Sequence, residues 1–331
     1  MFSFKSIHLI VGFCFLVGAS NRVFADRSFG ELLGWDADDV VVILHIDDVG
    51  MSHSSNQGAI LATENGVASS FAIMMPCPWV PEIARYLNAH PDADAGLHLT
   101  LTSEWKPYRW PPLAGPDVPG LIDPEGCLWS SVAQVVTQAT PNEIDREIRA
   151  QLARARRMNI PVTHLDSHMG TLFARPDYFA KYAQLGIEAQ IPILVAGGHL
   201  THTRVENPQA LDRLLTWIPK IWNAGLPIID DLHTGTYGWK RAEKIDRLIE
   251  LLTTLKPGIT EILFHASEPS DVFPLITSSS ESRKGDLEAL LSPRVKEAIK
   301  SHDIKLTTWK ELMKRRQALG QSDLESLRSR N

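Results

Sequence analysis

Short apolar segments alternate along the chain with longer segments whose apolar residues recur at helical spacing. The short segments have the length and composition of β-strands, and they lie at residues 40–46, 69–74, 94–99, 162–167, 188–195, 227–232, 258–265 and 304–307. Helical segments separate them, at residues 55–65, 81–88, 141–158, 176–185, 208–223, 240–255 and 293–301. This alternation is typical of right-handed βαβ units around a parallel sheet. We therefore expect an α/β fold, a TIM-barrel-like (β/α) barrel of seven to eight units, regular or distorted.

Two long connections interrupt the alternation. Residues 102–129 are rich in Pro, Gly and Trp, and residues 266–279 are rich in Ser and Pro. Long irregular loops in a compact domain are often functional. The tryptophans of the first loop, Trp105, Trp110 and Trp129, are therefore candidates either to stack on sugar rings or to close the barrel mouth by packing.

The amino-terminal segment has the pattern of a secretory signal. A basic residue precedes an apolar stretch at residues 7–19, and Val23-Phe24-Ala25 has the small-x-small pattern that signal peptidase cleaves. The alternative is an uncleaved anchor, but the apolar stretch is shorter than the ~20 residues that a bilayer span needs. We therefore predict a signal peptide at residues 1–25 and a secreted or periplasmic protein. We expect one barrel domain at residues 26–317 and a polar tail at residues 318–331.

The charge distribution limits the kinds of partner that we expect. The formal net charge is −6, and acidic and basic residues are interspersed. We therefore expect no nucleic-acid partner, and no membrane partner once the signal peptide is removed.

Cys77 and Cys127 follow the signal segment, and they either form a disulfide or remain as thiols. Neither belongs to a Cys-x-x-Cys motif.

Two adjacent carboxylates stand where the first apolar segment ends, in His45-Ile46-Asp47-Asp48-Val49-Gly50. Neighbouring residues of a strand point to opposite faces, so both aspartates can serve one site only if the strand ends here and the chain turns at Gly50. Two close carboxylates repel each other when both are ionised. A bound cation relieves this repulsion and leaves one carboxylate free as a base. The pair therefore predicts an active site that uses a metal ion.

Histidines stand near the ends of three further strand segments, namely His98, the pair His164 and His168, and His265. A single buried histidine is more often a hydrogen-bonded core residue than a ligand. However, the strand ends on one face of a parallel barrel converge in space. Imidazoles and a carboxylate that meet there form a ligand set suited to zinc or a similar divalent metal, with an open position for water.

Three motifs together resemble those of the YdjC-type carbohydrate deacetylases. That family includes the ChbG-like chitooligosaccharide deacetylases and is related more distantly to polysaccharide deacetylases. Its Asp-Asp-x-Gly motif is similar to Asp47-Asp48-Val49-Gly50, and its Gly-x-His motif is similar to Gly96-Leu97-His98. Its Thr-His-x-Asp-Ser-His motif, the most specific of the three, is similar to Thr163-His164-Leu165-Asp166-Ser167-His168. The resemblance covers most of the chain after the signal segment.

The resemblance implies three metal ligands, a base and an acid: Asp48, His98 and His168 for the metal, Asp47 as catalytic base and His265 as general acid. It implies one divalent ion, with zinc as the first choice and cobalt, nickel or magnesium as alternatives. The implied substrate is an acetylated oligosaccharide or polysaccharide, from which metal-activated water removes an N- or O-linked acetyl group. The alternatives are a metal-dependent hydrolase of another amide or ester, and a secreted carbohydrate-binding protein without turnover. No basic residue stands near the motifs to clamp a phosphate.

The chain also departs from the family. Members have Asn in place of His45, Phe in place of Val49, and further histidines where this chain has Met169-Gly170-Thr171. These positions flank the inner site, so they concern the identity of the substrate more than the metal chemistry. By the two-residue period of a strand, His45 points to the neighbourhood of Asp47, and we expect it to help bind substrate.

Three other polar features have open roles. Asp166 either orients a ligand imidazole or caps the next helix. His164 is four residues from His168, a spacing that shares no face at a strand end, so we expect it to be structural or to support a ligand. The Asp230-Asp231-Leu232-His233 stretch is also predicted to end a strand. It either contacts substrate or binds a second cation, or it is simply a polar strand terminus.

Overall fold

A computed structural model describes residues 27–208, 211 and 215–320, so the predicted signal peptide and most of the predicted tail lie outside the described residues. Its sheet has seven strands in the order β4-β3-β2-β1-β6-β5, with β7 beside β1. Their bounds are β1 (Val40–Val49), β2 (Ser70–Ile73), β3 (Ala95–Leu99), β4 (Val162–Ser167), β5 (Asp231–His233), β6 (Gly258–Phe264) and β7 (Lys305–Leu306). All these pairings are parallel, as the alternation of strands and helices predicts.

Strand β1 is the centre of the sheet, because it pairs with β2, β6 and β7. Its residues Val41, Val42, Ile43 and Leu44 are fully buried. A parallel strand that is covered on both faces has a continuous apolar run instead of an alternating one, and this sequence has such a run. The central position of β1 places the Asp47-Asp48 pair in the middle of the sheet's edge.

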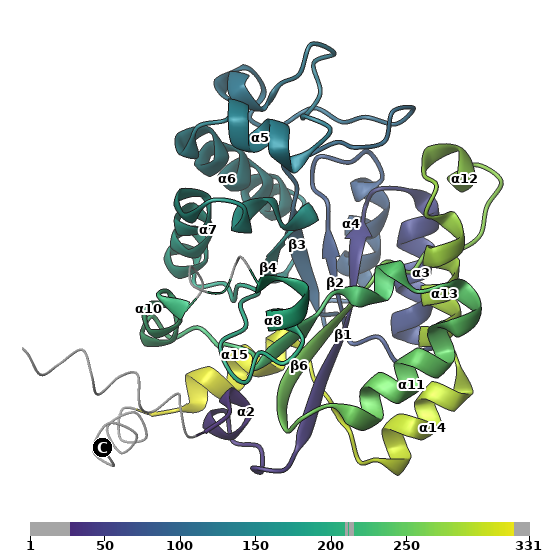
Figure 1. Cartoon of the computed structure of the whole chain (residues 1–331). Helices are drawn as coiled ribbons and strands as arrows, with labels where there is room; N and C mark the ends of the chain where they lie inside the picture. Colours follow the sequence, from purple (N-terminus) through teal and green to yellow (C-terminus); the bar gives the residue numbers. More distant parts are fainter. Residues whose placement is uncertain (1–26, 209–210, 212–214, 321–331) are drawn as a thin grey trace, which may run out of the picture.

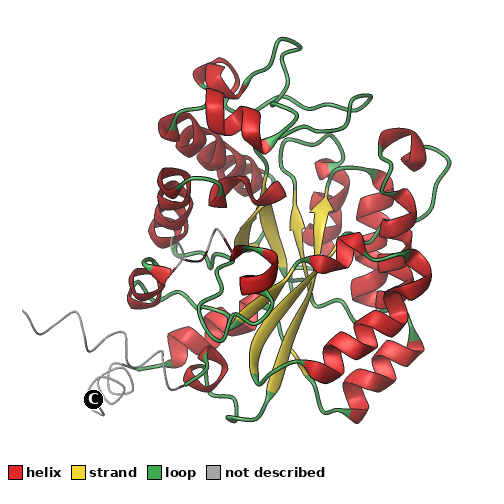
Figure 2. Ribbon diagram, in the orientation of Figure 1, coloured by secondary structure: helices red, strands yellow, loops and turns green. Residues whose placement is uncertain are grey.

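Helices surround the strands (Figures 1 and 2). The α-helices are α2 (Phe29–Leu32), α3 (His53–Glu64), α4 (Val80–Ala89), α5 (Val132–Gln138), α6 (Pro141–Arg157), α7 (Pro176–Ala189), α8 (Thr203–Glu206), α10 (Ile218–Asn223), α11 (Lys244–Thr254), α12 (Phe273–Ile276), α13 (Ser280–Leu290), α14 (Pro293–Ser301) and α15 (Trp309–Ala318). Figure 1 shows α5, α6, α7 and α10 on one side of the sheet and α3, α11, α13 and α14 on the other. The helices predicted near α3, α4, α6, α7, α10, α11 and α14 are present, whereas α2, α5, α8, α12, α13 and α15 were not predicted.

Helix α6 shows how local sequence fixes one wall of the site. Thr140 caps its first turn in a capping box with Glu143, and Pro141 occupies the first helical position. On its buried face, the Gln151 side chain accepts a hydrogen bond from Thr100 N at 3.0 Å and donates one to Thr100 O at 2.7 Å. Glu147 accepts from two backbone N–H groups of the long 102–129 loop. The helix therefore holds both the chain that leaves β3 and the loop that follows it.

The wall between β4 and β5 is irregular. Single parallel bridges join Leu165 to Ile193 and Ala196 to Ile229. The strand predicted at 188–195 is therefore wrong in extent, because α7 continues to Ala189 and ends with Gln190 in the left-handed conformation. The protein has an α/β fold with a parallel sheet curved into a distorted barrel. The count of seven to eight barrel units is not confirmed.

Two other expectations can be compared with the described residues. Cys77 is buried, Cys127 is partly exposed, and both thiols are free, so the disulfide alternative is not realised. Among the residues that the structure describes, no helix is both long and apolar enough to cross a membrane.

Candidate active site

A cavity of about 910 Å³ opens at the carboxyl ends of the strands. Its walls include the five residues that the sequence assigns to the site, namely Asp47, Asp48, His98, His168 and His265. The aspartates belong to β1 and His98 belongs to β3, whereas His168 and His265 directly follow β4 and β6. The strand ends therefore converge as expected for a parallel barrel.

A bulge in β1 allows both aspartates to face this cavity. The register between β1 and β2 shifts between Ile46 and Val49, and Asp48 has a φ of 64°, which is rare for a residue other than glycine. Gly50 follows with a φ of 84°, and a Cβ there would lie 2.9 Å from Val80 Cγ2. The strand thus continues to Val49 instead of ending at Asp48, and a strained backbone reorients the second carboxylate.

Asp48, His98 and His168 form a compact cluster of possible metal ligands. Asp48 Oδ1 lies 3.4 Å from His98 Nε2 and 3.2 Å from His168 Nδ1, and all three ligand atoms lie within 4.8 Å of one another. Ligands at zinc distances in a tetrahedral arrangement stand about 3.4 Å apart. Asp48 Oδ1 is buried and has no hydrogen-bond partner among the described residues. The geometry and the chemistry of these three groups fit a divalent cation.

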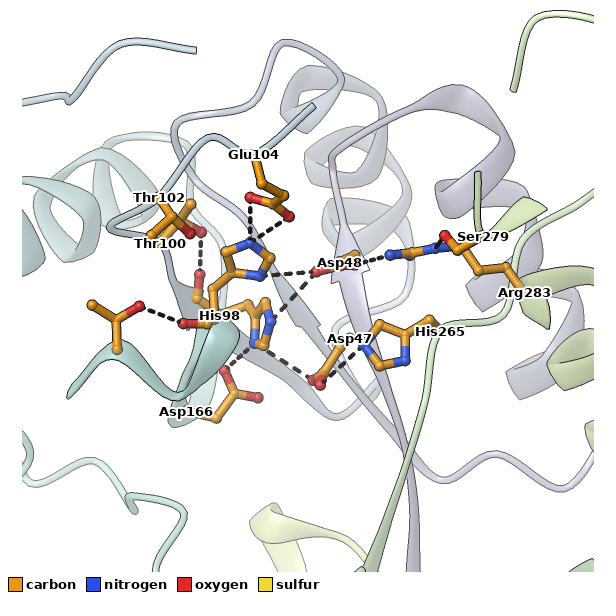
Figure 3. A network of polar contacts seen from close by, with 12 residues as sticks. Asp47, Asp48, His98, Thr100, Thr102, Glu104, Asp166, His265, Ser279 and Arg283 are labelled. Atoms are coloured by element: carbon orange, nitrogen blue, oxygen red, sulfur yellow. Dashed lines mark hydrogen bonds and ion pairs between the residues drawn. The ribbon is translucent and has the colours of Figure 1, made fainter. Parts of the chain in front are cut away.

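Two carboxylates orient the imidazoles of this cluster (Figure 3). His98 Nδ1 donates to Asp166 Oδ1 at 2.7 Å, and His168 Nε2 donates to Glu104 Oε1 at 3.0 Å. Each bond fixes the tautomer that leaves the nitrogen facing Asp48 free for a metal. Burial disfavours the imidazolium, but Glu104 and Asp48 outweigh it and raise the pKa of His168 to about 10. The surrounding carboxylates thus create a strong preference for positive charge.

Arg283 completes the surroundings of Asp48. It comes from α13, is 2% exposed, and donates from Nη2 to Asp48 Oδ2 at 2.6 Å. Burial alone would raise the pKa of Asp48, but the Arg283 guanidinium contributes to holding it well below its usual range. The same guanidinium lies 5.5 Å from the Trp105 ring and 5.6 Å from the Tyr237 ring. One Asp48 oxygen is therefore occupied by Arg283, and the other faces the two imidazoles.

Asp47 and His265 lie beside the metal-ligand cluster. Asp47 Oδ2 is 3.9 Å from His265 Nε2, and Figure 3 shows Asp47 between His98 and His265. Asp47 Oδ1 lies 3.2 Å from His45 Nε2. Burial lowers the pKa of His265 to about 4, so this imidazole is neutral at pH 7. The arrangement offers one carboxylate and one imidazole next to the place where a metal-bound water would stand.

The tryptophans of the long loop divide between the two expected roles. Trp105 lines the cavity. Trp110 is 1% exposed and its Nε1 donates to Thr102 O, while Trp129 Nε1 donates to Gly120 O. Trp105 is therefore available to contact a substrate, whereas Trp110 and Trp129 hold the loop by packing and hydrogen bonding.

Comparison with known proteins identifies the family. The model of the YdjC-like protein family matches residues 41–301. The chain belongs to the YdjC-like family. This confirms the resemblance drawn from the three sequence motifs.

Relatives of this YdjC-like protein match most of its length. A carbohydrate deacetylase of Thermus thermophilus is 30% identical over 261 residues, which cover 78% of this chain and 89% of the relative. A carbohydrate deacetylase of Thermoanaerobacter pseudethanolicus is 26% identical over 269 residues, with coverages of 81% and 97%. A similar fold occurs in a candidate cellobiose-phosphate cleavage protein of Enterococcus faecalis V583, at a TM-score of 0.69 and 21% identity over 83% of this chain and 99% of that one.

The structure also explains the glycine of the Gly-x-His motif in this YdjC-like protein. The His164 ring stacks on Trp309 at 5.5 Å, and a Cβ on Gly96 would overlap this ring. His45 is fully buried, and its Nε2 lies 3.1 Å from Asp166 and 3.2 Å from Asp47. His45 does not line the cavity. It therefore contacts the carboxylates of Asp47 and Asp166 and does not contact the substrate, contrary to the expectation.

Asp230 and Asp231 accept hydrogen bonds from backbone N–H groups. Asp230 accepts from the N–H groups of Phe29, Gly30 and Ile259 at 2.7–3.0 Å. Asp231 accepts from His202 N at 2.8 Å and, through its other oxygen, from the Thr203 backbone and hydroxyl. Asp231 is the first residue of β5, so this pair begins a strand, contrary to the prediction that it ends one. The hydrogen-bond partners of these two aspartates agree with the interpretation of Asp230 and Asp231 as a polar strand terminus.

Proposed function

We propose that this YdjC-like protein is a metal-dependent carbohydrate deacetylase that holds one divalent ion, zinc as first choice, on Asp48, His98 and His168. The observation that carries the proposal is the approach of these three ligand atoms to within 4.8 Å at the base of the cavity. The names of the Thermus and Thermoanaerobacter relatives support the substrate class. The set of one carboxylate and two imidazoles is typical of a catalytic zinc that keeps a position for water.

Such an ion would polarise the acetyl carbonyl and acidify a water molecule. Asp47 would be the base that accepts a proton from such a water. His265, 3.9 Å away, gives a proton to the leaving amine or alcohol. Because His265 is neutral at pH 7, that proton has to reach it during the reaction, and Asp47 is the neighbouring group that holds one.

The cavity walls suit a sugar. Trp105 and Tyr237 both line the cavity near Arg283, and aromatic rings stack on the apolar faces of pyranose rings. Arg283 Nη1 is buried, lines the same cavity with its side chain, and has no hydrogen-bond partner in the described part of the chain. It therefore favours a second candidate, the hydrolysis of another amide or ester that carries an anionic group.

Acetate release from a panel of substrates tests the proposal. The panel contains N-acetylated chitooligosaccharides, O-acetylated xylan, and simple anionic amides and esters. We expect acetate from one of the glycans, loss of this activity after chelation, and its return when zinc is added. Glycan binding without acetate release would favour the non-catalytic alternative. Turnover of the anionic amides alone would favour the second candidate.

We also propose that the protein is exported and acts as a secreted or periplasmic enzyme, on the basis of residues 1–25. Mature protein purified from the native host should begin near Asp26 by N-terminal sequencing. Recovery of the full-length chain from the membrane fraction would instead indicate an anchor.

A further inference from the structure

A second group of possible metal-ligating side chains is carried by α8 and β5, away from the strands β1, β3 and β4 that carry or precede the Asp48 cluster. His202, Glu206 and His233 place one possible ligand atom each within 4.8 Å of the others. His202 is the N-cap of α8 and Glu206 is its last residue, so the two are four positions apart and project from one face of the turn. His233 is the last residue of β5 and reaches the same point.

The two imidazoles of this group repeat the geometry of the active site. The rings of His202 and His233 have centroids 5.0 Å apart and an interplanar angle of 73°. The rings of His98 and His168 show the same values, 5.0 Å and 73°. In both places a carboxylate approaches the pair, Glu206 in one and Asp48 in the other.

His233 lacks the hydrogen bonds that a buried histidine normally makes. It is 7% exposed, and both of its ring nitrogens are buried without a hydrogen-bond partner in the described residues. Glu206 Oε1 lies 2.6 Å from His233 Nδ1, so this nitrogen faces a carboxylate, whereas Nε2 has neither a hydrogen bond nor an ion pair among the described residues. A buried ring nitrogen without a partner is costly unless another group binds it.

Other groups hold this cluster in place. Glu206 Oε2 accepts from the backbone N–H of Thr234 at 2.6 Å and from its hydroxyl at 3.0 Å, which leaves Oε1 turned toward His233. Asp231 accepts from His202 N, so it fixes the backbone that carries the first imidazole. A Cβ on Gly235 would lie 3.0 Å from the His233 ring and 3.1 Å from Glu206, so a small residue fits beside the cluster. The supporting carboxylate and backbone contacts are those that a built metal site requires.

We propose that His202, Glu206 and His233 bind a second divalent cation, with zinc best suited to two imidazoles and one carboxylate. Glu206 also lines the large cavity, so a cation held by these residues would lie beside the space where a substrate would bind. The cation ties α8 to the end of β5 and offers a ligand position to a hydroxyl or carboxylate of the substrate. The proposal is independent of the deacetylase assignment, because its test measures bound metal.

Zinc content of matched variants tests the proposal. Purified protein is stripped with a chelator, reloaded with two equivalents of zinc, separated from free metal and analysed by elemental mass spectrometry. We expect two zinc ions per chain in the wild type. His233→Ala and Glu206→Gln should each retain one, and Asp48→Asn should also retain one. Glu206→Gln preserves the shape of the side chain, so its zinc content tests the second site even if His233→Ala does not fold.

The exposed pair of His53 and Glu82 provides the control. His53 Nδ1 lies 2.7 Å from Glu82 Oε1, nearly the distance in the His233–Glu206 pair, but the His53 side chain is 54% exposed and no third ligand is grouped with it among the described residues. His53→Ala should therefore keep two ions. Equal zinc content in the wild type, His233→Ala and Glu206→Gln would overturn the proposal. Loss of metal from Asp48→Asn alone would support the active-site metal and reject the second one.

Discussion

Two pairs of adjacent aspartates lie in the barrel, and all four carboxylates are at least 95% buried. Asp47 and Asp48 stand near the carboxyl end of β1, whereas Asp230 and Asp231 stand at the beginning of β5. Each oxygen of the second pair accepts at least one backbone N–H. In the first pair, the two Oδ1 atoms have no hydrogen-bond partner among the residues described.

The difference shows that the partners of a buried acid, more than its burial, indicate its role. A carboxylate that accepts several N–H groups is part of the scaffold, because its desolvation is offset within the fold. A carboxylate that is buried with an unused oxygen beside imidazoles is stable only if a cation or a substrate completes it. We therefore expect the β1 pair to take part in the chemistry, whereas the β5 pair supports the backbone.

The largest effect should follow from Asp47→Asn. This change keeps the size of the side chain but removes the base, so we expect kcat for acetate release to fall by ~10⁴-fold, at the upper end of the usual range for acid–base catalysis. Thermal unfolding should show that the variant remains folded. Acetate release near the wild-type rate would mean that Asp47 has a structural role, as Asp230 and Asp231 do.

His265→Ala should slow kcat by ~10²–10⁴-fold while leaving bound metal unchanged. The loss should be smaller for an acetate ester of a nitrophenol, because a good leaving group needs no proton. Comparison of the nitrophenyl ester with an acetylated glycan measures this dependence. Equal losses on both substrates would argue against a general acid at His265.

Asp166→Asn should weaken zinc binding by ~10–100-fold, because the anion that orients His98 is lost. Glu104→Gln provides the matched test at His168 and should have an effect of similar size. Competition with a zinc-binding dye measures both affinities. Unchanged affinity in both variants would mean that these carboxylates do not support metal ligands.

The smallest effect should follow from Asp230→Asn, the counterpart of Asp47→Asn in the structural pair. An amide cannot accept from Phe29, Gly30 and Ile259 with both of its heavy atoms, so at least one N–H loses its acceptor. We expect a loss of about 1–3 kcal/mol in the free energy of unfolding. Acetate release per folded molecule should not change. Intact stability together with lost activity would break the distinction between the two pairs.

Much of the site could be predicted because its residues follow recognisable strands. Asp48, His98 and His168 each stand at or just after the end of a segment predicted as a strand, and the convergence of strand ends brings them together without further information. Glu104 and Arg283 could not be found in this way. Glu104 lies in an irregular loop that α6 positions through distant contacts, and Arg283 lies 235 positions after Asp48 within a run of serines and charged residues that looks like a solvated surface.

The fold was predictable to a similar degree. Segments with a clear hydrophobic pattern have nearly the expected bounds, as shown by the helical period of α6 and the continuous apolar run of β1. The segment at 188–195 was predicted as a strand because Ile191, Ile193 and Val195 favour that structure. In the molecule its first residues continue α7, and the rest bridges its neighbours at single positions. Tertiary contacts determine this outcome, and local sequence does not contain them.

The measurement that tests the account most directly is the zinc content of Asp47→Asn and Asp48→Asn, determined side by side with the wild type. The account predicts that Asp48→Asn binds one ion fewer per chain, because an amide is a poorer and uncharged ligand, and that Asp47→Asn binds as much zinc as the wild type. Both variants should lose acetate release. An Asp48→Asn variant with the full zinc content of the wild type would contradict the account.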